Sequence, residues 1–230
     1  MIEWIKSIFA LFFPRCCVVC GNPLLDAEEV LCVKCNMDMP RTGYHFFPEN
    51  PAERLFWGKI RIERATSFFF YLKGSDYKNI LYDLKYRGNK KLGETMGRFI
   101  ATELCCSHFF EGIDVIIPVP LHPDKKIKRG YNQSDWIAKG VAAVSGISVN
   151  LAAVTRIKDT ETQTKKTNFE RWENVSGIFE LISSPSCFEG KHILIIDDVL
   201  TTGATIIACA SAFNGISNLR VSVLTLAMAM

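Results

Sequence analysis

The stretch Ile193-Leu-Ile-Ile-Asp-Asp-Val-Leu-Thr-Thr-Gly-Ala-Thr205 decides the fold of this chain. Its first four residues are aliphatic and predict a buried central strand. Two adjacent carboxylates, Asp197 and Asp198, then stand at the C-terminal end of that strand. Because ligands bind at this end of the strands in open α/β sheets, the acid pair is a candidate ligand-binding element.

The residues after the acid pair predict an anion-binding turn. Thr201, Thr202 and Gly203 form a tight turn into a helix that begins with Ala204 and Thr205. Backbone N–H groups and threonine hydroxyls converge there, and the helix start is partially positive, so a phosphate fits. A Walker P-loop is excluded because the sequence contains no G-x-x-x-x-G-K-[ST] pattern.

Two carboxylates beside a phosphate site would repel a phosphate that touched them. We therefore expect them to face the neutral part of the same ligand, either accepting hydrogen bonds from vicinal ribose hydroxyls or holding a hydrated divalent ion. The pattern as a whole predicts a sugar phosphate bound with Mg²⁺.

Elsewhere, strand and helix patterns alternate, which predicts an α/β fold with a mostly parallel sheet. We expect strands near residues 65–72, 114–117, 149–154, 192–196 and 219–226, and helices near 75–88, 92–110, 133–144 and 204–213. The polar stretch 156–176 predicts a long loop, and such loops are usually functional. Cys105 and Cys106, on the second helix, are expected to fill the core.

Composition supports a folded domain with a small attachment. The chain has 230 residues, of which 48% are hydrophobic and 22% charged, so it is neither disordered nor fibrous. A net charge of +3 does not by itself indicate a nucleic-acid-binding protein. No stretch has the length of a transmembrane segment, and residues 1–13 predict an uncleaved amphipathic helix. This helix is expected to dock on the protein, with peripheral membrane contact or a partner groove as alternatives.

The cysteines form a separate pattern. Four of the nine form two C-x-x-C pairs, Cys17 with Cys20 and Cys32 with Cys35, whose spacing predicts a structural zinc knuckle. Disulfides and a redox pair are the alternatives, and Cys16 could replace Cys17. The predicted organisation is an N-terminal helix (1–13), a zinc knuckle (14–45) and an α/β domain (60–230). Such thiols favour a reducing, cytoplasmic location.

The chain resembles the competence protein F (ComF) family, in which a four-cysteine zinc element precedes a type I phosphoribosyltransferase domain. The stretch 193–205 resembles the binding motif for 5-phosphoribosyl-1-pyrophosphate (PRPP) of those enzymes. The other matching pieces are the two C-x-x-C pairs, Leu84-Lys-Tyr-Arg-Gly88, Ile117-Pro-Val-Pro-Leu-His122, Arg129-Gly-Tyr-Asn-Gln133, Arg156, Gln163, Arg171, Asn174 and Gly177.

The resemblance implies a role for each element. Asp197 and Asp198 would be the catalytic acids that hold the ribose hydroxyls, and residues 201–205 would bind the 5′-phosphate of PRPP. Pro118, Val119 and Pro120 would form the pyrophosphate loop, and residues 156–176 a flexible hood. The hood and basic rim would contribute Arg129, Arg156 and Arg171.

Two functions fit these expectations. The first is a glycosyltransferase of nucleotide metabolism that moves ribose 5-phosphate from PRPP to a nitrogen nucleophile. The second is a non-catalytic module that binds a nucleotide or single-stranded DNA in the same cleft and serves DNA uptake with other processing proteins, as the family name implies. Thirteen of the 27 basic residues lie in three loops that either function would use: Lys85, Arg87, Lys90, Lys91, Lys125, Lys126, Lys128, Arg129, Arg156, Lys158, Lys165, Lys166 and Arg171.

Overall fold

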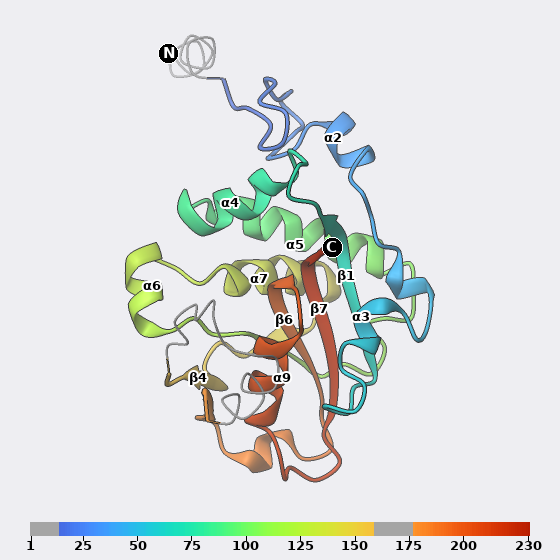
Figure 1. The fold of residues 1–230 in the computed structure, drawn as a ribbon, viewed down its shortest axis with the longest axis vertical. Helices are drawn as coiled ribbons and strands as arrows, with labels where there is room; N and C mark the ends of the chain where they lie inside the picture. The colour runs from blue at the N-terminus through green and yellow to red at the C-terminus, as the bar shows by residue number, and fades with distance from the viewer. Residues whose placement is uncertain (1–13, 159–176) are drawn as a thin grey trace.

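The central element of the fold is a five-stranded parallel sheet. The computed structural model describes residues 14–158 and 177–230 (Figure 1). The strand order is β1-β7-β6-β2-β3, and every pairing is parallel. The predicted α/β fold with a mostly parallel sheet is therefore confirmed. The strands are β1 (Arg64–Tyr71), β2 (Val115–Pro118), β3 (Ser148–Val149), β6 (His192–Leu200) and β7 (Arg220–Ala229).

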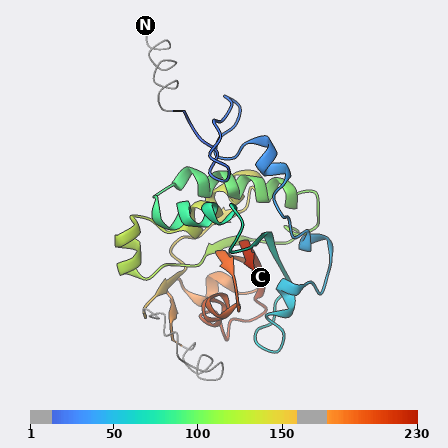
Figure 2. The ribbon, with the colours of Figure 1, turned by 45° about the horizontal axis from the view of Figure 1, so that its top comes forward.

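Three helices cover one face of the sheet: α4 (Lys78–Tyr86), α5 (Lys90–Leu104) and α7 (Gln133–Ser145). Figure 2 shows them as one layer. Leu194 and Ile196 of β6 are fully buried against this layer. Helices α5 and α7 meet at Gly97 and Gly140, where a Cβ on Gly140 would lie 2.0 Å from the Glu94 carbonyl oxygen. Only glycine allows the two backbones to approach so closely.

A second layer covers the other face. It comprises α3 (Pro51–Arg54), the antiparallel pair β4 (Val154–Arg156) and β5 (Phe179–Leu181), the 3₁₀ turn η2 (Pro185–Phe188) and α9 (Ala204–Ser211). Ile193 and Ile195 of β6 pack here. Because neighbouring residues of β6 point to opposite layers, its aliphatic run is buried on both sides, as expected for a central parallel strand.

The cysteine-rich segment packs on the layer formed by α4 and α5. Around it the chain forms only a short helix, α2 (Val33–Met37), and the 3₁₀ turn η1 (Tyr44–Phe46). The Tyr77 hydroxyl donates to the Cys35 carbonyl at 2.9 Å, and Arg41 pairs with Glu103 at 2.9 Å. Cys17, Val19 and Cys35 belong to the same core as α4, α5 and α7.

The structure differs from the sequence-based expectations in local elements. The basic stretch after residue 122, expected to be a loop, contains the helix α6 (Pro123–Arg129). His122 caps this helix by accepting from the Asp124 N–H at 3.4 Å. Helix α5 ends at Leu104, so Cys105 and Cys106 lie beyond it and are exposed. The expectation that these cysteines fill the core is wrong.

Two predicted segments fall partly or wholly outside the described residues. The amphipathic helix at 1–13 and residues 159–176 of the predicted hood are among those that the structure does not describe. Within the described ranges, no helix combines the length and the apolar character that a membrane crossing requires.

Candidate functional site

The acid pair lies beside the predicted pyrophosphate loop because β2 and β6 are neighbouring parallel strands. Pro118 is in register with Ile196, and the Val119 N–H donates to the Ile196 carbonyl at 2.9 Å. The Pro118-Val-Pro120 turn therefore leaves the sheet next to Asp197. The structure brings these two predicted elements together at the C-terminal edge of the sheet.

Asp197 is held in a network of hydrogen bonds. Its Oδ1 accepts from the Ser134 hydroxyl at 3.1 Å and from the Asp198 N–H at 2.8 Å. Burial, together with the neighbouring charge of Asp198, raises the pKa of Asp197 to about 7, while these hydrogen bonds and the charge of Lys85 oppose the rise. Asp197 is thus fixed in position, and its pKa lies well above that of an ordinary carboxyl group.

Asp198 is paired with a cation from another element. Its Oδ2 lies 3.1 Å from Nζ of Lys85, in the last turn of α4, and its side chain is only 13% exposed. Lys85 carries the charge that balances the acid pair from across the site. A ligand cation or hydroxyl that binds Asp198 must therefore share or displace this contact.

The segment between α6 and α7, together with the first turn of α7, makes hydrogen bonds at this edge of the sheet. The Tyr131 hydroxyl donates to the Leu84 carbonyl, and Asn132 Nδ2 donates to the Val119 carbonyl at 3.0 Å and to Asp135 at 2.7 Å. Burial raises the pKa of Asp135. Buried polar atoms without a hydrogen-bond partner in the described part of the chain include Asn132 Oδ1 and Gln133 Nε2. Since buried polar groups are rarely left unpaired, these two atoms are available to bond a further polar group, either water or a ligand.

The threonine-glycine turn follows β6 directly. Gly203 has φ +78°, and a Cβ there would lie 3.1 Å from Cε1 of Phe56, so both the backbone conformation and the packing require glycine. Thr202 Oγ1 accepts from the Ala204 N–H at 3.4 Å. Thr201, Thr202, Ala204 and Thr205 are exposed at the start of α9. This turn can therefore present N–H groups and hydroxyls to an anion.

The two predicted basic residues that the structure describes lie on different elements. Arg129 lies at the end of α6, with its guanidinium carbon 5.9 Å from the ring centre of Tyr86. Arg156 lies in β4; its Nε donates to the Lys158 carbonyl at 3.2 Å, and its guanidinium carbon is 5.5 Å from the ring centre of Phe179. Arg171 lies outside the described residues. The three arginines therefore stay predictions as phosphate ligands.

The four predicted metal ligands do come together. The Sγ atoms of Cys17, Cys20, Cys32 and Cys35 all lie within 4.8 Å of one another, and those of Cys20 and Cys32 are 3.8 Å apart. A tetrahedral zinc site with Zn–S bonds of about 2.3 Å has sulfur–sulfur separations of about 3.8 Å. The cluster can therefore hold a structural zinc ion.

The backbone around these sulfurs also suits a metal centre. The Cys32 N–H donates to the Cys17 Sγ, and the Cys35 N–H donates to the Cys32 Sγ, each at 3.4 Å. Burial raises the pKa of the Cys17 thiol, but hydrogen bonds from the N–H groups of Cys20, Cys32 and Val19 outweigh it and lower that pKa to about 7. Cys16 is exposed and hydrogen-bonds to the Pro14 carbonyl, and the cluster contains Cys17 and not Cys16.

Sequence reasoning missed three side chains that organise the edge. Lys85 and Asn132 lie inside the stretches 84–88 and 129–133, which match the family pattern. The sequence therefore marked both segments, but it could not predict which residues these two side chains contact. Ser134 carried no signal. Its contact with Asp197 joins residues 63 positions apart and depends on how α7 packs against β6.

Comparisons with known proteins find relatives of this chain by sequence. No family model matches the chain. The chain is 29% identical to DNA utilization protein YhgH of Salmonella typhi over 92% of this chain and 96% of that protein. It is also 34% identical to competence protein F of Haemophilus influenzae over 40% of this chain and 41% of that protein.

These relatives, together with the four-cysteine cluster, support the resemblance to the competence protein F family. Its parallel sheet, preceded by a four-cysteine module, is the arrangement that this resemblance implies. Among solved structures, it is similar to adenine phosphoribosyltransferase of Leishmania tarentolae, at 12% identity and a TM-score of 0.38, over 83% of this chain and 94% of that one.

Proposed function

We propose that this protein binds PRPP, or a related ribose 5-phosphate compound, with Mg²⁺ at the C-terminal edge of its sheet. One observation carries the proposal. A single strand, β6, presents the acid pair beside the Pro118-Val-Pro120 turn and then continues into the threonine-glycine turn at α9. Sites for ribose hydroxyls, pyrophosphate and 5′-phosphate therefore follow one another along one edge.

In this proposal, different residues of the chain bind the different parts of the ligand. The N–H groups and hydroxyls of residues 201–205 bind the 5′-phosphate, where the partial positive charge at the start of α9 favours an anion. Asp197 and Asp198 accept hydrogen bonds from the ribose hydroxyls. The pyrophosphate lies against the turn at 118–120, within reach of cations from the basic segments.

The donor set also fits magnesium. Mg²⁺ prefers carboxylate and phosphate oxygens and keeps several water molecules, and the acid pair offers carboxylate oxygens beside the proposed pyrophosphate position. When bound, the ion neutralises negative charge on the pyrophosphate. Lys85 supplies a cation to Asp198 from the protein itself.

In the transferase form of this proposal, the bond between the anomeric carbon and the pyrophosphate oxygen breaks, and a bond to a nitrogen nucleophile forms. The names of the relatives support a link to DNA uptake or use. The alternative is a module that holds a nucleotide or single-stranded DNA in the same cleft without turnover. Release of pyrophosphate from PRPP, measured across nucleobases and amines, distinguishes the two.

We further propose that the cysteine cluster holds one structural zinc ion. Four thiolates complete a tetrahedral site and leave no open position for a substrate, which excludes a catalytic role for such an ion. The division into a helix at 1–13, a knuckle at 14–45 and a domain at 60–230 is retained as part of this proposal.

A calorimetric titration of PRPP with Mg²⁺ tests the ribose-phosphate site. The double variant Asp197→Asn/Asp198→Asn is expected to weaken binding about 100-fold or more, because two charge-assisted hydrogen-bond acceptors are lost. The matched control is Asp26→Asn/Asp76→Asn, which removes the same charge from two exposed positions. Absence of binding by the wild type, or equal binding by both double variants, would overturn the assignment.

A further inference from the structure

Two exposed tyrosines on α4 form an aromatic pair that the ribose-phosphate proposal does not use. Tyr82 and Tyr86 are one helical turn apart and are 52% and 68% exposed. Their ring centres lie 5.0 Å apart, with the ring planes inclined by 46°. Neither ring contributes to the core that α4 forms with Ile80, Leu81 and Leu84. Two adjacent exposed rings of this kind are available to stack on a planar group.

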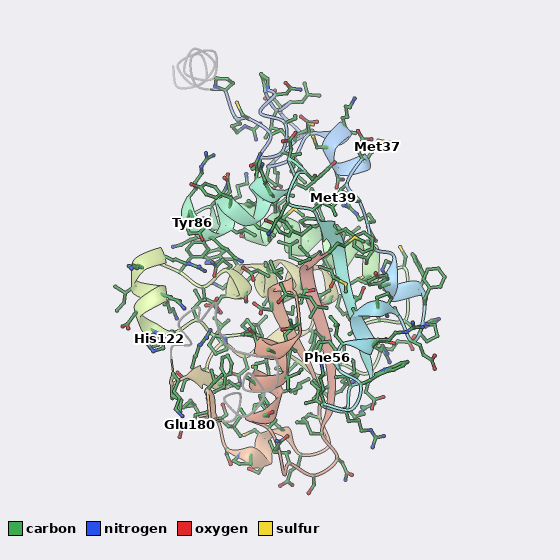
Figure 3. All side chains as sticks on the ribbon, in the orientation of Figure 1. Met37, Met39, Phe56, Tyr86, His122 and Glu180 are labelled. Atoms are coloured by element: carbon green, nitrogen blue, oxygen red, sulfur yellow. The ribbon has the colours of Figure 1, made fainter. Side chains whose placement is uncertain are left out.

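Cations flank both rings. The guanidinium carbon of Arg87 lies 5.6 Å from the ring centre of Tyr82, and that of Arg129 lies 5.9 Å from the ring centre of Tyr86. Both distances are within the range of cation–π contacts. Figure 3 shows Tyr86 at the end of α4 that faces α6. The two helices thus present one surface.

Helix α6 gives this surface a strong positive charge. Four of its seven residues are cationic, none of its residues is buried, and Asp124 is its one acidic residue. On α4 the acid nearest the tyrosines, Asp83, is paired with Arg87 at 3.3 Å and its side chain is only 10% exposed. Asp83 therefore offsets Arg87, and Asp124 can offset one of the four cations of α6, so the surface keeps a net positive charge. The cations of α6 are Lys125, Lys126, Lys128 and Arg129.

We propose that Tyr82, Tyr86 and the cations around them form a platform on which bases of a single-stranded polynucleotide stack. Aromatic faces beside a cationic track are the combination that binds single strands, because bases stack on the rings while phosphates pair with the cations. Duplex DNA hides its base faces and cannot use the rings. A partner protein or an anionic membrane would use the charge without needing stacked rings.

The platform adjoins the ribose-phosphate edge but is separate from it. Lys85, which lies between the two tyrosines in sequence, reaches Asp198 with its amino group. The two tyrosines project from the same helix into solvent. This inference goes beyond the proposed PRPP site and does not depend on it, so either proposal can fail alone.

The test is fluorescence anisotropy of a labelled 20-nucleotide oligothymidine and of an abasic oligonucleotide of the same length. We expect the wild type to bind oligothymidine at least about tenfold more tightly than the abasic strand, because each stacked base contributes measurably. Tyr82→Ala/Tyr86→Ala is expected to remove that difference. Tyr82→Phe/Tyr86→Phe is expected to retain it, because phenylalanine keeps the stacking face.

Controls separate stacking from folding and from charge. Phe46→Ala/Phe47→Ala removes two other exposed rings, which are 59% and 64% exposed, and is expected to leave binding unchanged. Arg87→Gln/Arg129→Gln is expected to reduce the slope of log K against log salt by about 0.7 for each lost phosphate contact. PRPP titration of the tyrosine-to-alanine variant reports separately on the ribose-phosphate site and on folding.

Three results would overturn the platform: no binding of oligothymidine by the wild type at low salt, equal binding of the abasic strand, or undiminished preference for oligothymidine in the alanine variant. Tighter binding of duplex than of single-stranded DNA would also contradict it.

Discussion

The cysteine module and the C-terminal edge of the sheet both concentrate reactive side chains. They differ in whether those side chains face one another or face solvent. In the module, four sulfurs face one another within 4.8 Å, and backbone N–H groups donate to two of them. At the edge, Asn132 and Gln133 keep buried polar atoms without partners in the described part of the chain, and the threonines beyond β6 are exposed. Sulfurs that face one another indicate a closed metal site, whereas exposed hydroxyls and N–H groups at a helix start indicate a surface that a ligand can reach.

Helix α4 connects the two regions. At its start, the Tyr77 hydroxyl donates to the carbonyl of Cys35, a predicted zinc ligand, at 2.9 Å. In its last turn, Lys85 pairs with Asp198 at 3.1 Å. The position of Lys85 at the acid pair therefore depends on a helix that is anchored to the cysteine module. How far the two regions act independently can be measured.

Breaking the module should give the largest effect. Cys35→Ser replaces a buried sulfur of the cluster and is expected to lower bound zinc from about one ion per chain to near zero, with a loss of stability above about 3 kcal/mol, because metal binding supplies folding energy to such small modules. Metal analysis and urea unfolding measure the two quantities. The control is Cys16→Ser, an exposed neighbour outside the cluster. Full zinc content and normal stability in Cys35→Ser would refute the metal site.

PRPP binding by the same variant sharpens the comparison. If α4 transmits the state of the module to the acid pair, Cys35→Ser weakens PRPP binding as well. Unchanged affinity in a folded, zinc-free variant would show that the two regions are independent and that the anchoring of α4 has no functional effect.

The stability of the folded chain should depend on pH through Asp197. Because burial and Asp198 raise the pKa of Asp197 to about 7, the folded chain holds a proton between about pH 4 and 7 that the unfolded chain releases. This group's contribution to stability therefore falls as pH rises through that window and is constant above it.

Asp197→Asn removes this pH-dependent contribution. The variant is expected to be more stable than the wild type by about 1 to 2 kcal/mol at pH 8 and to lose that advantage towards pH 5. Urea unfolding at both pH values measures the difference. Asp76→Asn, at an exposed position on the surface, is expected to show no such trend. An advantage of the same size at both pH values would contradict the assignment.

The sequence predicted the parts of the site that are encoded locally. Four aliphatic residues, two acids and a threonine-glycine turn occupy one continuous segment, so strand β6, its acidic end and the start of α9 follow from thirteen residues. The two C-x-x-C pairs are equally local, since each pair places two thiols on one turn. The parallel direction of the strands, though not their order in the sheet, followed from the alternation of strand and helix patterns.

What could not be predicted depends on contacts between distant segments. The pairing of Lys85 with Asp198 joins two residues on different layers, and no local pattern marks it. Helix α6 was missed because Pro123 and three lysines resemble a solvated loop, although proline is favoured in the first turn of a helix. Cys105 and Cys106 were misplaced because the end of α5 determines their exposure, and no strong stop signal follows Leu104.

Two glycines, one in each region, should give the smallest difference in stability between the two regions when each is replaced by alanine. Gly21 has φ +74°, and a Cβ added there would meet nothing within 4 Å, whereas Gly203 has φ +78° and its Cβ would lie 3.1 Å from Phe56. Gly21→Ala therefore meets only the cost of the left-handed conformation, about 1 to 2 kcal/mol. Gly203→Ala meets the same cost and also pushes against a fully buried ring, so it should be more destabilising and should weaken PRPP binding by displacing the turn. Urea unfolding and PRPP titration of both variants measure this. Equal losses of stability with unchanged PRPP affinity would show that the turn tolerates displacement and does not bind the phosphate.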